Sequence, residues 1–76
     1  MKTHKFEPYF TGKPLVKVQY WYNDTHIFKQ VGKAVLSAEI TAEQLSNLDS
    51  LYSNEQMAAA QIFGDAYGPK RDDDEF

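Results

Sequence analysis

The chain has 76 residues, 42% of them hydrophobic, with five Tyr, five Phe and one Trp, and its net charge is −3. A chain of this length forms at most one domain and buries only about 60% of the surface that its unfolded state exposes. The sequence has no cysteine, which excludes disulfides and thiolate chemistry. It also has no apolar run near the roughly 18 residues of a membrane span and no apolar signal segment, so we expect a cytoplasmic protein without membrane contact.

Residues 15–31 have the pattern of a β-hairpin. β-branched and aromatic residues dominate both halves, and Asn23-Asp24 between them is typical of a tight turn. A two-residue turn predicts three pairs on one face: Tyr22 with Thr25, Tyr20 with Ile27, and Val18 with Lys29. The opposite face would then carry Lys17, Gln19, Trp21, His26, Phe28 and Gln30.

The next residues predict one more strand and then helices. Gly32-Lys33 is a second turn or a bulge, and residues 34–40 alternate as a third strand would. Thr41 and Gln44 have the spacing of a capping box, which predicts a helix from about Ala42. Residues 53–56 repeat that signal, so we expect two short helices rather than one long helix, with the second ending at Gly64.

These elements predict an α+β fold in which an antiparallel hairpin or three-stranded sheet packs against one or two C-terminal helices. We expect residues 1–13 to form an N-terminal extension, residues 14–66 the single domain, and residues 67–76 a flexible acidic tail.

The charges are distributed unevenly along the chain. Residues 1–33 contain six lysines and two acidic residues, whereas residues 34–69 contain five acidic residues and neither Lys nor Arg. The asymmetry is explained either by two layers of one fold that match in charge or by two surfaces that bind two partners.

The sequence offers little for catalysis. His4 and His26 are the only histidines, and they do not have a metal-binding spacing. Glycine-rich phosphate loops, nucleophile elbows and cysteine nucleophiles are all absent from the sequence. We therefore expect no enzyme activity, no cofactor and no metal.

The aromatic hairpin suggests one binding function. Trp21 and Phe28 are close in sequence to Lys17, Lys29 and Lys33, and rings interleaved with cations are used to bind single-stranded nucleic acid. Exposure of Trp21 and Phe28 together on a lysine-lined face would favour this function, and burial of both would count against it.

The last residues of the chain suggest a second binding function. Asp72, Asp73, Asp74 and Glu75 precede a terminal Phe76. This segment resembles the acidic tip of bacterial and phage single-stranded DNA-binding proteins, which ends in phenylalanine and docks onto replication and repair proteins. The resemblance covers five residues, and Glu75 stands where bacterial tips usually have proline. It implies that Phe76 and Asp72 to Asp74 bind a partner protein; the alternative is a tail that only increases solubility.

The second predicted helix is apolar on nearly every side. Its segment 57–63 includes Met57, Ala60 and Phe63, and this is more apolar surface than a small core needs from one short helix. We expect a partner-binding surface or a homodimer contact there.

The sequence thus predicts a non-enzymatic protein-binding module, a small regulator or inhibitor of a host protein such as phages and mobile elements encode. The alternative is a single-stranded nucleic-acid-binding accessory protein whose tail recruits replication or repair proteins.

Overall fold

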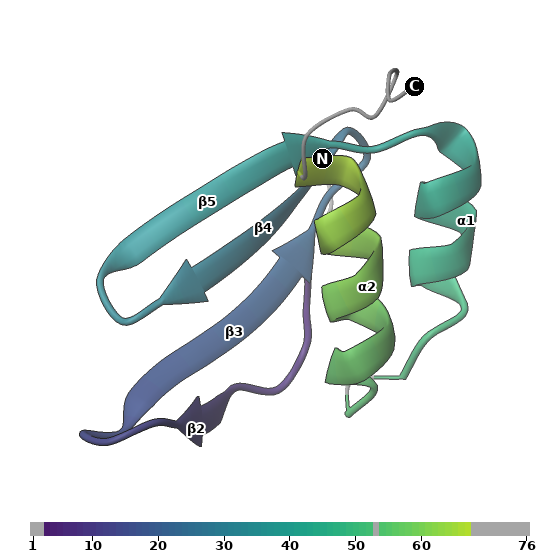
Figure 1. Ribbon diagram of the computed structural model, residues 1–76. Helices are drawn as coiled ribbons and strands as arrows, with labels where there is room; N and C mark the ends of the chain where they lie inside the picture. Colours follow the sequence, from purple (N-terminus) through teal and green to yellow (C-terminus); the bar gives the residue numbers. More distant parts are fainter. Residues whose placement is uncertain (1–2, 53, 68–76) are drawn as a thin grey trace, which may run out of the picture.

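The computed structural model describes residues 3–52 and 54–67, which form an antiparallel sheet with two helices against one face (Figure 1). The predicted α+β class is confirmed. The described elements are β1 (His4–Lys5), β2 (Tyr9–Thr11), β3 (Val16–Tyr22), β4 (His26–Val31), β5 (Ala34–Glu39), α1 (Ala42–Asp49) and α2 (Gln56–Tyr67).

The sheet has more strands than the sequence predicted. β3 pairs with β4, and β4 pairs with β5, while β1 and β2 both pair with the other side of β3. Phe6, between β1 and β2, is only 4% exposed and joins the core. We expected residues 1–13 to lie outside the domain, but residues 4–11 belong to its sheet. Two strands of two and three residues interrupted by Pro8 give too short an alternation to recognise in sequence.

The hairpin of β3 and β4 has the predicted faces but a different register. Tyr22 pairs with Ile27 and Tyr20 with Lys29, a shift of two residues from our prediction. The turn lies one residue later than predicted, because the Asn23 N–H donates to the His26 carbonyl at 2.9 Å and the Asn23 side-chain carbonyl accepts from the backbone N–H groups of Thr25 and His26. A shift by an even number of residues leaves each side chain on its predicted face.

Gly32 and Lys33 form the predicted second turn, because Val31 pairs with Ala34 on either side of them. Gly32 has φ +60°, which a glycine adopts without strain and which suits the first central position of a hairpin turn.

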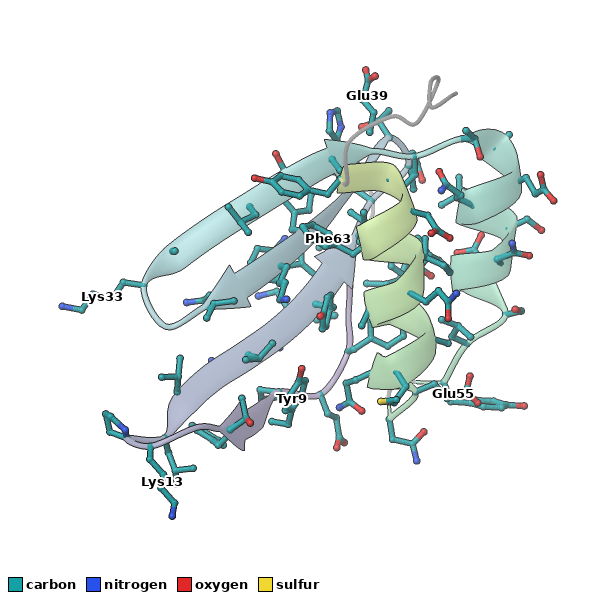
Figure 2. The ribbon with its side chains drawn as sticks, viewed as in Figure 1. Tyr9, Lys13, Lys33, Glu39, Glu55 and Phe63 are labelled. Carbon is teal, nitrogen blue, oxygen red and sulfur yellow. The ribbon has the colours of Figure 1, made fainter. Side chains whose placement is uncertain are left out.

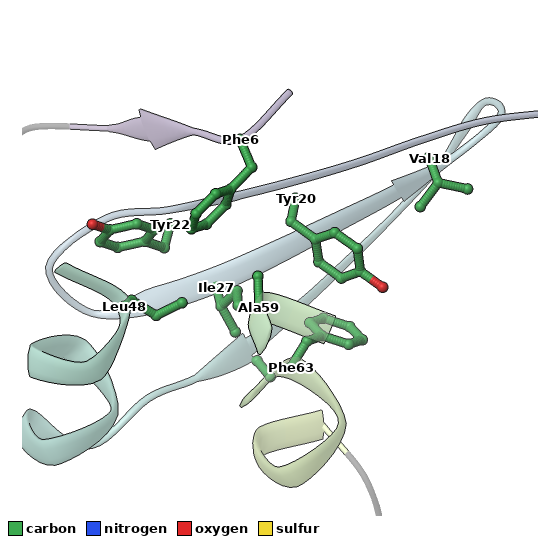
Figure 3. Close-up of a cluster of buried hydrophobic side chains, with 9 residues drawn as sticks. Phe6, Val18, Tyr20, Tyr22, Ile27, Leu48, Ala59 and Phe63 are labelled. Carbon is green, nitrogen blue, oxygen red and sulfur yellow. The ribbon is translucent and has the colours of Figure 1, made fainter. Parts of the chain in front are cut away.

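The core lies between the sheet and the helices (Figure 3). Tyr20, Ile27 and Leu48 are the largest fully buried side chains, and they come from β3, β4 and α1. The alternation is clearest in β3, where Val18, Tyr20 and Tyr22 are buried and the residues between them are not, as a sheet covered on one side requires. Nine buried residues form this cluster: Phe6, Val18, Tyr20, Tyr22, Ile27, Ala38, Leu48, Ala59 and Phe63.

The two predicted helices are confirmed, and so is the capping box. The Thr41 hydroxyl accepts from the Gln44 backbone N–H at 3.1 Å, and the Gln44 side chain accepts from the Thr41 N–H at 2.9 Å. The predicted end at Gly64 was wrong, since α2 continues to Tyr67. Ala66 packs against the core and the Tyr67 ring stacks on Phe63, and these contacts offset the roughly 1 kcal/mol that a helical glycine costs.

The layers also separate the charges. Residues 3–40 carry five lysines and three acidic residues, whereas residues 41–67 carry four acidic residues and neither Lys nor Arg. The charge asymmetry of the sequence therefore corresponds to a sheet richer in lysine and an acidic helical layer.

One hydrogen bond ties α1 to the sheet and gives the fold a pH dependence. The buried Tyr22 hydroxyl donates to the Asp49 carboxylate at 2.7 Å. Burial raises the pKa of Tyr22 well above its ordinary value of 10.0, and the bond to Asp49 raises this pKa further. Burial also raises the pKa values of Tyr20 and Tyr9.

We therefore expect stability to be lost in alkali. Tyrosines deprotonate more readily in the unfolded chain, so their contribution to the free energy of unfolding should be fully present below pH 10.0 and be lost as the pH rises above it. The fall should reach at most about 1.4 kcal/mol per pH unit for each such tyrosine. Urea unfolding at a series of pH values measures it. Tyr22→Phe should reduce the alkaline slope, and an unchanged slope in that variant would contradict this role of Tyr22.

Candidate partner-binding site

The first turn of α2 carries the most exposed large apolar side chain of the described residues. Met57 is 88% exposed, although Ala59 two residues later is fully buried. Exposing a methionine offers no gain to folding, because burial of such a side chain stabilises a fold by about 1.5–3 kcal/mol. The position of Met57 is therefore better suited to contact with another molecule than to the core.

A shallow pocket of about 260 Å³ lies beside Met57. It is lined by Tyr9, Gln56, Met57 and Ala60, so strand β2 forms one wall and α2 the other. Figure 2 shows Tyr9 on β2 facing the N-terminal half of α2. The walls are mostly apolar, and the space is suited to one side chain of a partner rather than to a whole small molecule.

A hydrogen bond holds the two walls together. The Gln56 side-chain amide donates to the backbone carbonyl of Glu7 at 2.6 Å, which links the start of α2 to the segment between β1 and β2. Glu7, which accepts this bond through its backbone carbonyl, is an exposed acidic residue, and a second acidic residue, Glu55, immediately precedes Gln56. The pocket therefore has an apolar interior with acidic residues next to Gln56, while the Lys29 ammonium on the sheet side is close enough to Tyr9 to act on the pKa of that tyrosine.

Only two of the three α2 residues that we predicted to bind a partner lie at the pocket. Met57 and Ala60 line the pocket together, as expected for a shared surface. Phe63 does not belong to that surface, because it is only 5% exposed and its ring meets Tyr20 edge-on at 6.1 Å. Our assignment of Phe63 to a partner surface was wrong. α2 contacts β3, β4 and β5, the three strands that the sequence predicted, and we underestimated how many apolar residues this contact needs from one helix.

The other face of the sheet carries the predicted aromatic pair. Trp21 and Phe28 are paired residues of β3 and β4, and their rings stack at 5.5 Å with an angle of 11°. Both are half-buried, which is neither the full exposure nor the burial that would decide between the two functions. No described helix covers this face. Lys5 pairs with Trp21, and Lys17 lies on the same face of β3.

Lys29 lies on the opposite side from this aromatic pair. It pairs with Tyr20 on the face toward the helices, and its ammonium group is 5.6 Å from the centre of the Tyr20 ring and 5.9 Å from that of Phe63. The grouping of Lys29 with Trp21 and Phe28 was therefore wrong. Its alternation with Phe28 along β4 already placed the two on different faces. Lys33 is exposed in the turn between β4 and β5.

The acidic tail that the sequence predicts to bind a partner lies outside the described residues. Its Asp72 to Asp74 and Phe76 are therefore not described, and the resemblance of the tail to single-stranded DNA-binding proteins stays a prediction. Among residues 3–52 and 54–67, no group of His, Asp or Glu is placed to hold a metal. No helix of the described chain has the length and apolarity to cross a membrane.

Sequence reasoning missed half of the pocket. Tyr9 was assigned to an extension, and Gln56 was read only as a helix-capping residue. The alternation of Tyr9 and Thr11 was the available signal, but it spans only three residues.

No protein-family model, curated protein or solved structure matches the chain.

Proposed function

We propose that the protein is a non-enzymatic protein-binding module that regulates or inhibits its partner by capturing an apolar side chain in the pocket between β2 and α2. The observation that carries the proposal is Met57, 88% exposed at the rim of a pocket that it forms with Tyr9, Gln56 and Ala60. An exposed methionine adapts its shape to a partner surface at little cost.

The acidic residues next to Gln56 suggest the partner's chemistry. Glu55 immediately precedes α2, and Glu7 accepts the hydrogen bond from Gln56. No lysine or arginine occurs from residue 34 to residue 69. A partner segment with Leu, Ile, Met or Phe next to Lys or Arg would fill the pocket and meet these carboxylates.

Selection from a random-peptide display library tests the proposal without knowledge of the natural partner. We expect the selected peptides to combine one large apolar residue with a neighbouring basic residue. Met57→Glu removes an apolar contact, and Ala60→Glu fills the pocket. Each should weaken peptide binding at least about tenfold, since burying such a side chain is worth about 1.5–3 kcal/mol. Fluorescence anisotropy of labelled peptides measures the change.

Ala58→Glu is the matched control. Ala58 is exposed on the same helix turn but does not line the pocket. This variant adds the same charge and should bind as wild type does. Selected peptides that bind Met57→Glu and Ala60→Glu with unchanged affinity would exclude the pocket as the binding site.

A second candidate function is favoured by the stacked Trp21 and Phe28. They lie with Lys5 and Lys17 on the face that no described helix covers, an arrangement that suits stacking on the bases of a single strand. A tail that recruits replication or repair proteins would complete this function.

Titration of Trp21 fluorescence with an oligonucleotide tests this candidate. If Lys5, Lys17 and Lys33 each contact a phosphate, log K should fall against log salt concentration with a slope of about −2. Lys17→Gln should reduce the slope by about 0.7, whereas Lys29→Gln, on the other face, should leave it unchanged. Trp21 fluorescence that does not respond to the oligonucleotide at low salt would exclude nucleic-acid binding by this face.

A further inference from the structure

The two edges of the sheet differ in how well they are protected against pairing with another strand. One edge consists of β1 and β2, which have two and three residues and are separated by Pro8. Short strands and proline are common ways to prevent edge pairing. The other edge is β5, six residues from Ala34–Glu39 that include neither Lys nor Pro. Within the described chain, β5 pairs only with β4.

The hydrogen bonds of β5 show which of its backbone groups point outward. The Ile40 N–H donates to the Thr25 carbonyl at 3.0 Å, so Ile40 faces the strand that pairs with β5. Because hydrogen-bonded pairs alternate along an antiparallel ladder, Leu36 and Ala38 also direct their N–H and C=O groups at β4. Val35 and Ser37 direct theirs to the free edge.

Charges of opposite sign stand at the two ends of this edge. Figure 2 shows Lys33 in the turn before β5 and Glu39 at the other end of the strand. Both are an odd number of residues from the buried Ala38, so they belong to the sheet face opposite the helices. Both side chains are exposed, and both are three residues from Leu36. An edge with this symmetry of charge is complementary to itself when it is turned by half a rotation about Leu36.

We propose that β5 pairs with β5 of a second copy of this chain, antiparallel about a two-fold axis at Leu36, so that the two sheets become one. Leu36 then lies opposite Leu36 of the second copy, and Val35 lies opposite Ser37. Lys33 of each copy faces Glu39 of the other. A shift of two residues in either direction keeps the faces of the sheet but separates these charges, so the charges select one register.

Amide hydrogen exchange tests which residues of β5 form hydrogen bonds to the second copy. The N–H groups of Val35 and Ser37 should exchange more slowly as the protein concentration rises, because only the second copy can bond them. Those of Leu36 and Ala38 bond to β4 and should be protected at every concentration. Equal protection of all four amides at low and high concentration would overturn the proposal.

Charge exchange tests the register. Lys33→Glu places four carboxylates in two facing pairs, and Glu39→Lys does the same with ammonium groups. Each should weaken dimerisation about tenfold or more in sedimentation equilibrium. The double variant restores opposite charges and should return the dimer to wild-type affinity. Single variants that dimerise as wild type does would show that this register is wrong.

Ser37→Pro tests the use of the edge itself. Proline removes the N–H that points outward but none that bonds to β4, so the monomer should keep its fold and lose the dimer. A wild-type chain that stays monomeric at millimolar concentration, or a dimer that survives both Ser37→Pro and the charge variants, would overturn the proposal. Neither result depends on the pocket between β2 and α2.

Discussion

Replacement of Phe63 by alanine is expected to lower the free energy of unfolding by about 3–5 kcal/mol, the range for a large aromatic residue removed from a core. Phe63 is 5% exposed, its ring meets Tyr20 edge-on, and the Lys29 ammonium lies over it at 5.9 Å. In a domain of this size such a loss approaches the whole stability. Chemical denaturation followed by circular dichroism measures it.

Met57→Ala is the control, because Met57 lies on the same helix and is 88% exposed. It should change the free energy of unfolding by no more than about 0.5 kcal/mol. Equal losses in the two variants would mean that α2 does not present Phe63 to the sheet and Met57 to the solvent.

Ala59→Asp is expected to prevent folding. Ala59 is fully buried where α2 packs on the sheet, and the described core contains no charged residue that could neutralise a carboxylate. An unpaired buried charge costs several kcal/mol, and the larger side chain also lacks space. We expect the spectrum of an unfolded chain at neutral pH, measured by nuclear magnetic resonance.

Ala58→Asp adds the same charge one residue earlier, where the side chain is exposed. This variant should fold and lose no more than about 0.7 kcal/mol, the cost of aspartate in a helix. A folded Ala59→Asp variant with dispersed resonances would contradict the packing of α2.

The parts of the fold that sequence predicted depend on local patterns. The Thr41 and Gln44 capping box begins α1 as predicted, since each partner lies within three residues of the other. The alternation along β3 and β4 assigned Tyr20 to the covered face and Trp21 to the other, and it did so despite the error in register.

The parts that sequence missed depend on contacts between distant residues. β1 and β2 are strands because they pair with the edge of β3 that β4 leaves unpaired. Their own five residues have no clear alternation of apolar and polar side chains. α2 passes Gly64 because Ala66 and Tyr67 pack beyond it. The pocket requires Tyr9 and Met57, 48 positions apart in sequence, to be brought together by the sheet. Periodicity in one segment cannot predict such a pair.

The resonances of two side chains test most directly the claim that a partner binds in the pocket between β2 and α2. Met57 is the only methionine besides Met1, and Trp21 is the only tryptophan, so a methyl signal reports on the pocket and an indole N–H signal on the uncovered sheet face. Addition of a selected peptide should shift the Met57 methyl signal to saturation, with the affinity that anisotropy gives, and leave the Trp21 indole signal in place. A peptide that binds with the Met57 signal unmoved and the Trp21 signal shifted would contradict the account.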